Sequence, residues 1–252
     1  MRSQGQSLNY ERSGTRESEP MLDQLKQQVY EANLRIDREG LVLLTWGNVS
    51  AVDRAQDVFV IKPSGVGYDA LSSDRMVPVS LSSGRVLDGT SRPSSDTATH
   101  RELYRAFPSI RAIVHTHSLY ATAWAQAGRE IPVLGTTHAD YFEGPIPVTR
   151  ALRKREIETD YELHTAKVIA ERFRTIDPMR LPAVLVAGHG PFVWGASLQE
   201  AVENAIVLEC TAQMASVTVS LNRSIRPLSK ALLDKHFMRK HGAKATYGQS
   251  HK

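Results

Sequence analysis

The sequence predicts an α/β domain in which short strands and amphipathic helices are interleaved along one chain of 252 residues. Apolar runs of strand length end at turn residues, and between them apolar side chains recur at helical spacing. The runs show no strict strand–helix–strand alternation, and no linker rich in Pro, Gly or Ser divides residues 21–252. We therefore expect a single domain over residues 21–252, preceded by a disordered polar tail at residues 1–20.

The first part of the chain predicts one helix followed by strands. Residues 21–39 have apolar side chains at helical spacing. Residues 41–53, "LVLLTWGNVSAVD", predict two strands joined by a turn at residues 46–48. Residues 57–65, "DVFVIKPSG", predict a strand that enters a turn, and residues 76–89, "MVPVSLSSGRVLDG", predict a hairpin with its turn at the Ser-Gly pair.

The rest of the chain predicts mainly helices, with strands between them. The stretch "PSSDTATHRELYRAF" starts a helix with Ser and Asp as candidate caps, and "AIVHTH" predicts a buried strand. The remaining predicted elements are a helix at 118–127, a helix at 156–174, a strand–turn–strand unit at 182–195, a helix at 198–220 and a helix from Ser229.

The composition favours a globular protein and gives no sign of a membrane span, a secretory signal or a disulfide. A hydrophobic content of 41% and a charged content of 23% are typical of a soluble globular protein, and no apolar stretch approaches the ~20 residues of a membrane span. The first twenty residues lack an apolar core, so we expect no secretory signal. The single cysteine, Cys210, excludes an internal disulfide and fits a reducing compartment such as the cytoplasm. The net charge of +4 suits a phosphorylated substrate but does not by itself indicate nucleic acid.

Three histidines are candidate metal ligands. His115 and His117 end the predicted strand "AIVHTH", where residues i and i+2 point to one face with Cβ atoms about 7 Å apart. Two imidazoles at that spacing can converge on one ion; the ordinary alternative is one exposed and one hydrogen-bonded histidine. His189 stands between Gly188 and Gly190 where a buried strand breaks, and it is either a third ligand or an exposed turn residue.

A carboxylate is a candidate fourth ligand. Asp96 lies at the start of the helix predicted in "PSSDTATHRELYRAF", where it is either a ligand or a helix cap. With a single cysteine, any metal must use His and carboxylate ligands, which suit zinc and also Mn²⁺ or Co²⁺. The other histidines give weaker signals: His100, His138, His164, His236 and His241.

Two stretches suit a phosphate group. "KPSG" places Lys62, Ser64 and Gly65 at a strand end, and "PSSD" places Ser94 and Ser95 at a helix start, where unpaired N–H groups favour an anion. The glycine-rich nucleotide-binding motifs G-x-x-x-x-G-K-[ST] and G-x-G-x-x-G are absent from the sequence. Together with the metal candidates, these stretches predict a metal-dependent enzyme that acts on a phosphorylated substrate.

Ordered motifs along residues 21–249 closely resemble the bacterial L-ribulose-5-phosphate 4-epimerases, a family of the class II aldolase and adducin-head superfamily. The resemblance rests on "LTWGNVSAVD" with "VFVIKPSGV", on "PSSDTATHRELYRAFPSIRAIVHTH", on "GTTHADYF" and on "LLDKHFMRKHGAKATYGQ". Epimerases of ascorbate and gulonate catabolism share most of these motifs. The resemblance implies a three-layer αβα sandwich with a mixed, largely antiparallel sheet.

The resemblance also implies roles for particular residues. One zinc ion per subunit would be held by His115, His117 and His189, with Asp96 as fourth ligand or close partner. The phosphate pocket would consist of Asn48, Ser64, Gly65, Ser94 and Ser95, with Lys62 at the reacting end. Asp140 and Tyr247 would be the acid/base pair, supplied by the neighbouring subunit of a ring-shaped homotetramer, and Thr136 and Glu162 would support the site. One departure is visible, because relatives commonly have His-Ser-His where this chain has Ala187–Gly188–His189.

The implied reaction interconverts L-ribulose 5-phosphate and D-xylulose 5-phosphate, in arabinose or ascorbate catabolism. C4 is not adjacent to the carbonyl, so the implied route breaks and re-forms the C3–C4 bond with zinc as Lewis acid.

Three alternatives remain open from the sequence. A fuculose-phosphate aldolase of the same superfamily usually has Glu where this chain has Asp96, and the "HAD" and "KHGAK" motifs favour the epimerase. A non-catalytic binding protein like the adducin head would not need all four ligand candidates. A nucleic-acid binder is suggested by "KHFMRKHGAK" and a pI near 9.2, but no basic stripe interleaved with aromatics supports it.

Overall fold

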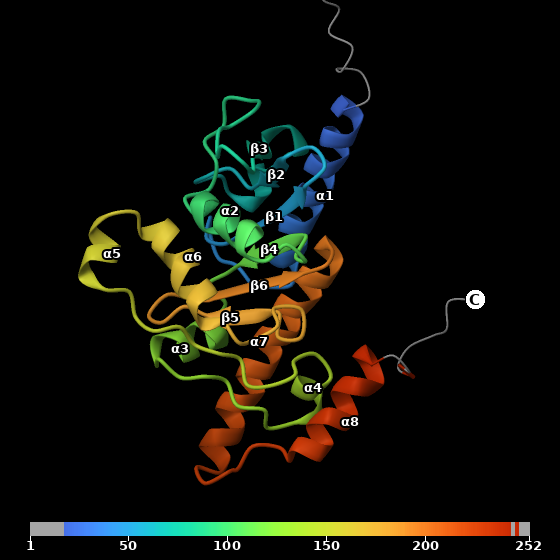
Figure 1. The fold of residues 1–252 in the computed structure, drawn as a ribbon, viewed down its shortest axis with the longest axis vertical. Coiled ribbons are helices and arrows are strands. Elements are labelled where there is room, and N and C mark those ends of the chain that lie inside the picture. The colour runs from blue at the N-terminus through green and yellow to red at the C-terminus, as the bar shows by residue number, and fades with distance from the viewer. Residues whose placement is uncertain (1–17, 243–244, 247–252) are drawn as a thin grey trace, which may run out of the picture.

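The computed structural model describes residues 18–242 and 245–246, which form a six-stranded sheet with helices on both faces (Figure 1). Across the sheet the strands lie in the order β3-β2-β1-β4-β6-β5, and every neighbouring pair is antiparallel. A parallel pairing occurs as an isolated bridge between Val148 and Leu185. The strands are β1 Asn48–Asp53, β2 Val58–Ile61, β3 Val77–Ser80, β4 Ala112–His115, β5 Ala183–Leu185 and β6 Pro191–Gly195.

Helices form a layer on each face of this sheet, which confirms the predicted αβα sandwich. The helices of one layer are α1 (Ser18–Arg38), α3 (Leu119–Gln126) and α7 (Leu198–Leu221), and those of the other are α2 (Thr97–Ala106) and α6 (Tyr161–Arg172). The shorter or peripheral helices are α4 (Thr136–Ala139), α5 (Lys154–Glu158) and α8 (Lys230–His241), together with the 3₁₀ turns η1 (Tyr68–Ala70) and η2 (Ser73–Arg75).

Each face of the sheet has its own apolar core, because side chains alternate along a strand. In β4, Ala112 and Val114 belong to the core beneath α1, α3 and α7, whereas Ile113 belongs to the core beneath α2 and α6. His115 continues this alternation. Its ring stacks on Phe192 of the second core, with centroids 4.1 Å apart and planes 16° apart.

The strand predicted at the start of residues 41–53 is absent, and that prediction is wrong. The segment before β1 is a loop in which Leu44 has a φ of 57°, in the left-handed region, and Leu43 and Leu44 are 62% and 70% exposed. Gly47 has a φ of 78°, and a Cβ atom there would lie 2.9 Å from the carbonyl oxygen of His115. The loop therefore turns tightly against the end of β4 instead of pairing as a strand.

Two other predicted elements are only partly correct. The hairpin at residues 76–89 has its first strand, but the return is limited to a bridge between Val79 and Val86, because Val86 remains 42% exposed and gains little from pairing. The helix predicted at 156–174 is two helices, α5 and α6, separated by Thr159 and Asp160. The Thr159 hydroxyl donates to the carbonyl of Arg155, a local bond that competes with continuation of the helix.

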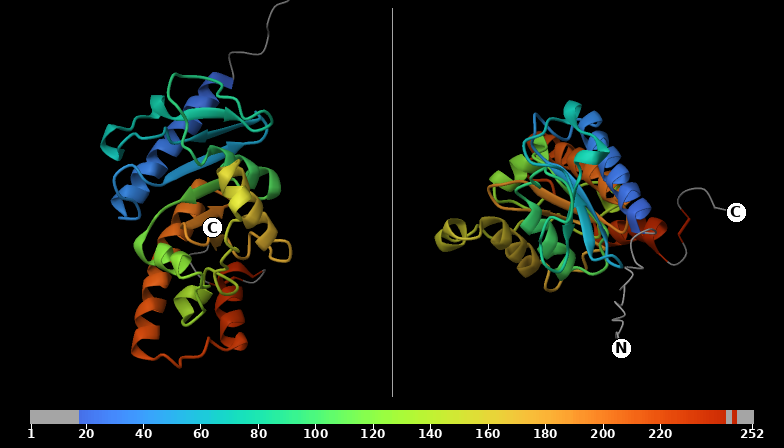
Figure 2. Two further views of the ribbon diagram at one scale, coloured as in Figure 1. Left: turned by 90° about the vertical axis from the view of Figure 1, so that its left-hand side faces the viewer. Right: turned by 90° about the horizontal axis from the view of Figure 1, so that it is seen from above.

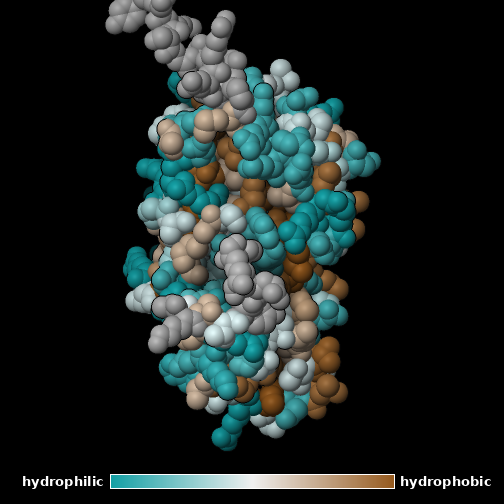
Figure 3. Space-filling model, turned by 90° about the vertical axis from the view of Figure 1, so that its right-hand side faces the viewer, coloured by the Kyte–Doolittle hydropathy of each residue, from teal (hydrophilic) through white to brown (hydrophobic). Residues whose placement is uncertain are grey.

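The end of the chain forms a projection beyond the sheet (Figure 2). Helix α7 continues past the strands, and residues 222–229 return the chain to α8, which packs against α4. The distal half of α7 exposes Met214, Val217 and Leu221, and apolar surface follows that side of the molecule in Figure 3. Among the described helices, none has the length and apolar character that crossing a bilayer requires.

A buried histidine makes stability depend on pH. His138 of α4 is 4% exposed, and its Nε2 donates to the carbonyl of Gly144 at 2.8 Å. Burial lowers the pKa of His138 from 6.5 to about 4, although the bond to Gly144 acts in the opposite direction. The unfolded chain therefore takes up a proton near pH 6.5, whereas the folded protein does so only near pH 4.

We expect the free energy of unfolding to fall as the pH decreases through this window. In His138→Gln, which retains a side-chain donor, the loss between neutral pH and pH 4 should be smaller by about 2–3 kcal/mol. Urea unfolding of the metal-free protein and of the variant across this range measures the difference. Identical pH dependence in the two proteins would contradict the assignment.

Candidate functional site

Three histidine rings converge at one edge of the sheet. His115 ends β4, His117 follows two residues later, and His189 lies in the turn between β5 and β6. Their ring centroids are 4.8–5.0 Å apart, and their candidate ligand nitrogens all lie within 4.8 Å of one another. The Nε2 atoms of His115 and His117 are 3.2 Å apart. The strand ends at His115, so the two rings meet through the following turn and not along one strand face.

Two of these imidazoles, those of His117 and His189, are in the form that binds a metal. Burial lowers the pKa of His189 to about 4, and the nearby His115 and His117 rings lower it further. Burial likewise lowers the pKa of His117, with His115 adding to the effect. Both rings are therefore neutral at pH 7, and neutral imidazole nitrogens are ligands for a divalent ion. The three converging nitrogens fit the expected zinc site.

Asp96 lies beside this cluster but outside the set of three nitrogens. It precedes α2 without making a side-chain cap hydrogen bond, so the plain helix-cap interpretation does not apply. Its Oδ2 instead accepts a hydrogen bond from Asn48 Nδ2 at 2.7 Å. Burial opposes ionisation, but the histidines His115 and His100 and the bond from Asn48 hold the pKa of Asp96 below its ordinary value. A negative charge is thus kept next to the histidine cluster.

Asn48 links the histidine edge to the predicted phosphate residues. Its Nδ2 also donates to Ser94 Oγ at 3.1 Å, and its Oδ1 is buried without a hydrogen-bond partner among the described residues. A buried amide oxygen of this kind favours a site that receives a further polar group.

A cavity of about 360 Å³ brings together most of the predicted site residues. It is lined by all four candidate metal ligands and by all six candidate phosphate residues. The lining residues include Asn48, Lys62, Ser64, Gly65, Ser94, Ser95, Asp96, His115, His117, Glu162 and His189. The cavity therefore joins a metal candidate to an anion candidate within one space of substrate size.

Lys62 supplies a buried cation to this cavity. The residue is 1% exposed, and its Nζ donates to the carbonyls of Val66 at 2.7 Å and Thr45 at 3.3 Å. The Nζ also lies 4.8 Å from the centroid of the Tyr68 ring. Burial lowers the pKa of Lys62 to about 8, so the amine is mostly charged at neutral pH but titrates close to it.

Asp140 does not line the cavity in its own chain. Its carboxylate accepts hydrogen bonds from His236 Nδ1 at 3.0 Å and from Arg239 Nε and Nη2 at 3.0 and 2.8 Å. Its carbonyl accepts one from His241 Nε2 at 2.9 Å. Asp140 therefore attaches α8 to α4, and Tyr247 lies outside the described residues.

Two aromatic residues that line the cavity are not among the site residues predicted from the sequence. Trp46 lies in the loop before β1, with its ring centroid 6.2 Å from that of His117. Tyr161 begins α6, and its hydroxyl is 3.2 Å from His189 Nδ1. Tyr161 lies directly before Glu162, which the resemblance implies as a supporting residue, and this adjacency was the signal available in the sequence. Ala187 donates its backbone N–H to Thr149 Oγ1 at 3.1 Å, at the position where relatives commonly have histidine.

Known proteins share this fold. Residues 27–216 match the family described as Class II Aldolase and Adducin N-terminal domain. The match spans most of the chain, and the protein belongs to this family.

Several solved structures have a similar fold. An L-fuculose 1-phosphate aldolase has a TM-score of 0.71 at 23% identity, covering 84% of this chain and 94% of that one, which shows a shared fold. YgbL from Klebsiella pneumoniae, a putative aldolase/epimerase/decarboxylase, has a TM-score of 0.66 at 27% identity, covering 85% and 98%. The L-fuculose-1-phosphate aldolase from Thermus thermophilus has a TM-score of 0.61 at 25% identity, covering 81% and 98%.

We expect the wild-type protein to bind one divalent ion per chain and His117→Asn to lose it. The asparagine removes one of three converging nitrogens, and the two that remain are too few for a stable site. Metal content by elemental analysis after equilibration with zinc and desalting measures the effect. His164→Asn is the matched control, because His164 lies on α6 and does not line the cavity. A His117→Asn protein that retains a full complement of zinc would contradict the assignment.

Proposed function

We propose that the protein is a metal-dependent epimerase that interconverts L-ribulose 5-phosphate and D-xylulose 5-phosphate. The observation that carries the proposal is one cavity in which three converging histidines face residues suited to a phosphate. A sugar phosphate has both features, since its hydroxyl and carbonyl oxygens can meet a metal while its phosphate meets Ser64, Ser94 and Ser95. We propose zinc as the ion, with Mn²⁺ and Co²⁺ as alternatives for the same donor set.

The chemistry requires that charge be stabilised next to the breaking bond. A base removes the proton of the C4 hydroxyl, the C3–C4 bond breaks, and its electrons move into the C2 carbonyl to give an enediolate. The released aldehyde, glycolaldehyde phosphate, rotates and is attacked on its other face, and an acid returns a proton to the new C4 oxygen. A bound divalent ion would supply Lewis-acid stabilisation of the developing negative charge.

Residues of the cavity are suited to the other parts of this task. The Lys62 ammonium provides a second positive charge near the reacting end, in a position where burial strengthens its effect. The hydroxyls of Ser94 and Ser95 and the backbone N–H of Ser95, just before α2, suit a phosphate held by the helix end. If the phosphate of the glycolaldehyde phosphate is held, the aldehyde can rotate without leaving the cavity.

We propose that Asp140 and Tyr247 transfer the protons, and that both reach the cavity of a neighbouring subunit in a homotetramer. Two features support this arrangement. Asp140 is ordered by three side chains of α8 but does not line the cavity of its own chain. The distal part of α7 also exposes Met214, Val217 and Leu221, and exposed apolar surface is typical of association between subunits.

Aldol cleavage of a sugar phosphate is the second candidate function. It is favoured by the two structural neighbours named as L-fuculose 1-phosphate aldolases, and the same histidine edge and phosphate residues could serve that cleavage. The two functions differ in what leaves the enzyme, because an aldolase releases its two fragments, whereas an epimerase retains and rejoins them. A non-catalytic binding role is a third and weaker candidate, since it does not explain the convergence of the histidines.

We expect the zinc-loaded protein to convert L-ribulose 5-phosphate to D-xylulose 5-phosphate without net release of glycolaldehyde phosphate. The ketose product is measured in a coupled assay, and free aldehyde is measured by chemical trapping in the same reaction. Incubation with a chelator should abolish conversion, and added zinc should restore it. Release of dihydroxyacetone phosphate from L-fuculose 1-phosphate, with no epimerisation, would replace the first candidate by the second.

We expect His117→Asn and Tyr247→Phe chains to be inactive separately and partly active when they are mixed. Some interfaces of a mixed tetramer would combine an intact histidine edge with an intact acid/base pair. Co-expression with two different purification tags selects the mixed oligomer, and epimerase activity is then measured. A confirmed mixed oligomer that remains as inactive as its parents would show that the whole site lies within one chain.

A further inference from the structure

His115 and His189 are held through the same ring nitrogen, Nδ1. His115 Nδ1 lies 2.9 Å from the carbonyl oxygen of Pro191, and His189 Nδ1 lies 3.2 Å from the hydroxyl of Tyr161. A carbonyl can only accept, so His115 carries its proton on Nδ1 and directs the Nε2 lone pair to the cluster. A phenol oxygen can accept in the same way, which would give His189 the same tautomer.

Tyr161 is well placed to act on His189. It lines the cavity with the three histidines, and its ring centroid is 6.1 Å from that of His189. As the first residue of α6, it has its carbonyl bonded by the Thr165 hydroxyl at 2.9 Å. The next carbonyl, that of Glu162, accepts a hydrogen bond at 2.7 Å from Thr99, a buried residue of α2. The position of Tyr161 is thus fixed against the helix that Asp96 precedes.

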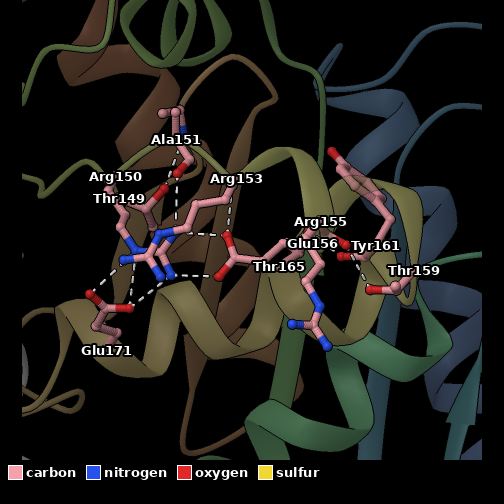
Figure 4. A network of polar contacts seen from close by, with 11 residues as sticks. Thr149, Arg150, Ala151, Arg153, Arg155, Glu156, Thr159, Tyr161, Thr165 and Glu171 are labelled. Atoms are coloured by element: carbon pink, nitrogen blue, oxygen red, sulfur yellow. Dashed lines mark hydrogen bonds and ion pairs between the residues drawn. The ribbon is translucent and has the colours of Figure 1, made fainter.

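A network of polar contacts around Arg150 joins α5 and α6 to the chain before α5 (Figure 4). The Arg150 guanidinium forms two 2.8 Å hydrogen bonds to the Glu156 carboxylate on α5, and a 3.1 Å ion pair with Glu171 on α6. The adjacent Thr149 accepts the backbone N–H of Ala187, two residues before His189, at 3.1 Å. The segment at 149–150 therefore contacts both α6, which begins at Tyr161, and the chain two residues before His189.

We propose that Tyr161 is a positioning residue that fixes the ring orientation and tautomer of His189 for metal binding. This inference rests on the proposed metal function. The phenol oxygen accepts the Nδ1 proton of His189, which leaves Nε2 unprotonated and directed to the metal. Partners of this kind raise the basicity of a ligand and reduce the freedom that it loses on binding.

The test is the zinc affinity of the Tyr161→Phe variant, measured by competition with a chromophoric chelator. Loss of such a partner typically weakens metal binding about 10- to 100-fold, and that is the expected change. Tyr30→Phe is the matched control, because Tyr30 lies on α1 outside the cavity and its hydroxyl has no hydrogen bond among the described residues. This control should bind zinc with wild-type affinity.

Two further readouts separate positioning from a general structural effect. The thermal midpoint of metal-free Tyr161→Phe should match that of metal-free wild type, since the phenyl ring can fill the same space. ¹⁵N NMR of the histidine side chains should show one Nδ1-protonated form of His189 in the metal-free wild type and a mixture of tautomers in the variant. Unchanged zinc affinity, or an equal loss in Tyr30→Phe, would overturn the inference.

The same experiment distinguishes this inference from the proposed function. Wild-type protein that binds no zinc would overturn both. Wild-type protein that binds zinc, with a Tyr161→Phe variant of equal affinity, would overturn only the role of Tyr161.

Discussion

The register of β4 between its two neighbours is the constraint on which the site depends. Across one ladder His115 faces Asn48 of β1, and across the other it faces Phe192 of β6. Because side chains alternate along a strand, a slip of one residue would turn His115 to the opposite core. It would separate this ring from Phe192, on which it stacks, and from the other two histidines. Backbone hydrogen bonds in the middle of the sheet thus determine the geometry of the three candidate ligands.

Antiparallel pairing then brings distant parts of the sequence to the same edge. The ends of β2 and β4 lie beside the starts of β1 and β6, so Lys62, Asn48, His115 and the His189 turn share one margin of the sheet. The helix α2 covers the adjacent face and adds Ser94, Ser95 and Asp96 from the residues before it. No single segment supplies these residues: the sheet order brings the strand ends together, and the chain before α2 adds the others.

The sequence predicts which residues gather at this edge of the sheet, because each of the motifs that indicate them is only a few residues long. The histidine pair, the Gly-His-Gly turn and the two serine turns each lie where an element starts or ends, and such positions can be recognised locally. The conformation of the loop before β1 could not be predicted from the sequence. Its apolar residues suggest a strand, and only the tight approach of Gly47 to β4 prevents one. The attachments of Asp140 to α8 and of Tyr161 to His189 join residues 96 and 28 positions apart, and no local pattern encodes them.

The close approach at Gly47 also divides the loop before β1 into a fixed part and a variable part. A side chain at Gly47 would meet Val42 at 2.7 Å and the carbonyl of His115 at 2.9 Å, so enlarging this residue would push the loop off the end of β4. Leu43 and Leu44, by contrast, point largely into solvent. Substitutions at those two positions should therefore be tolerated more readily than at the glycine, so this loop can vary in sequence while its contact with β4 stays constant.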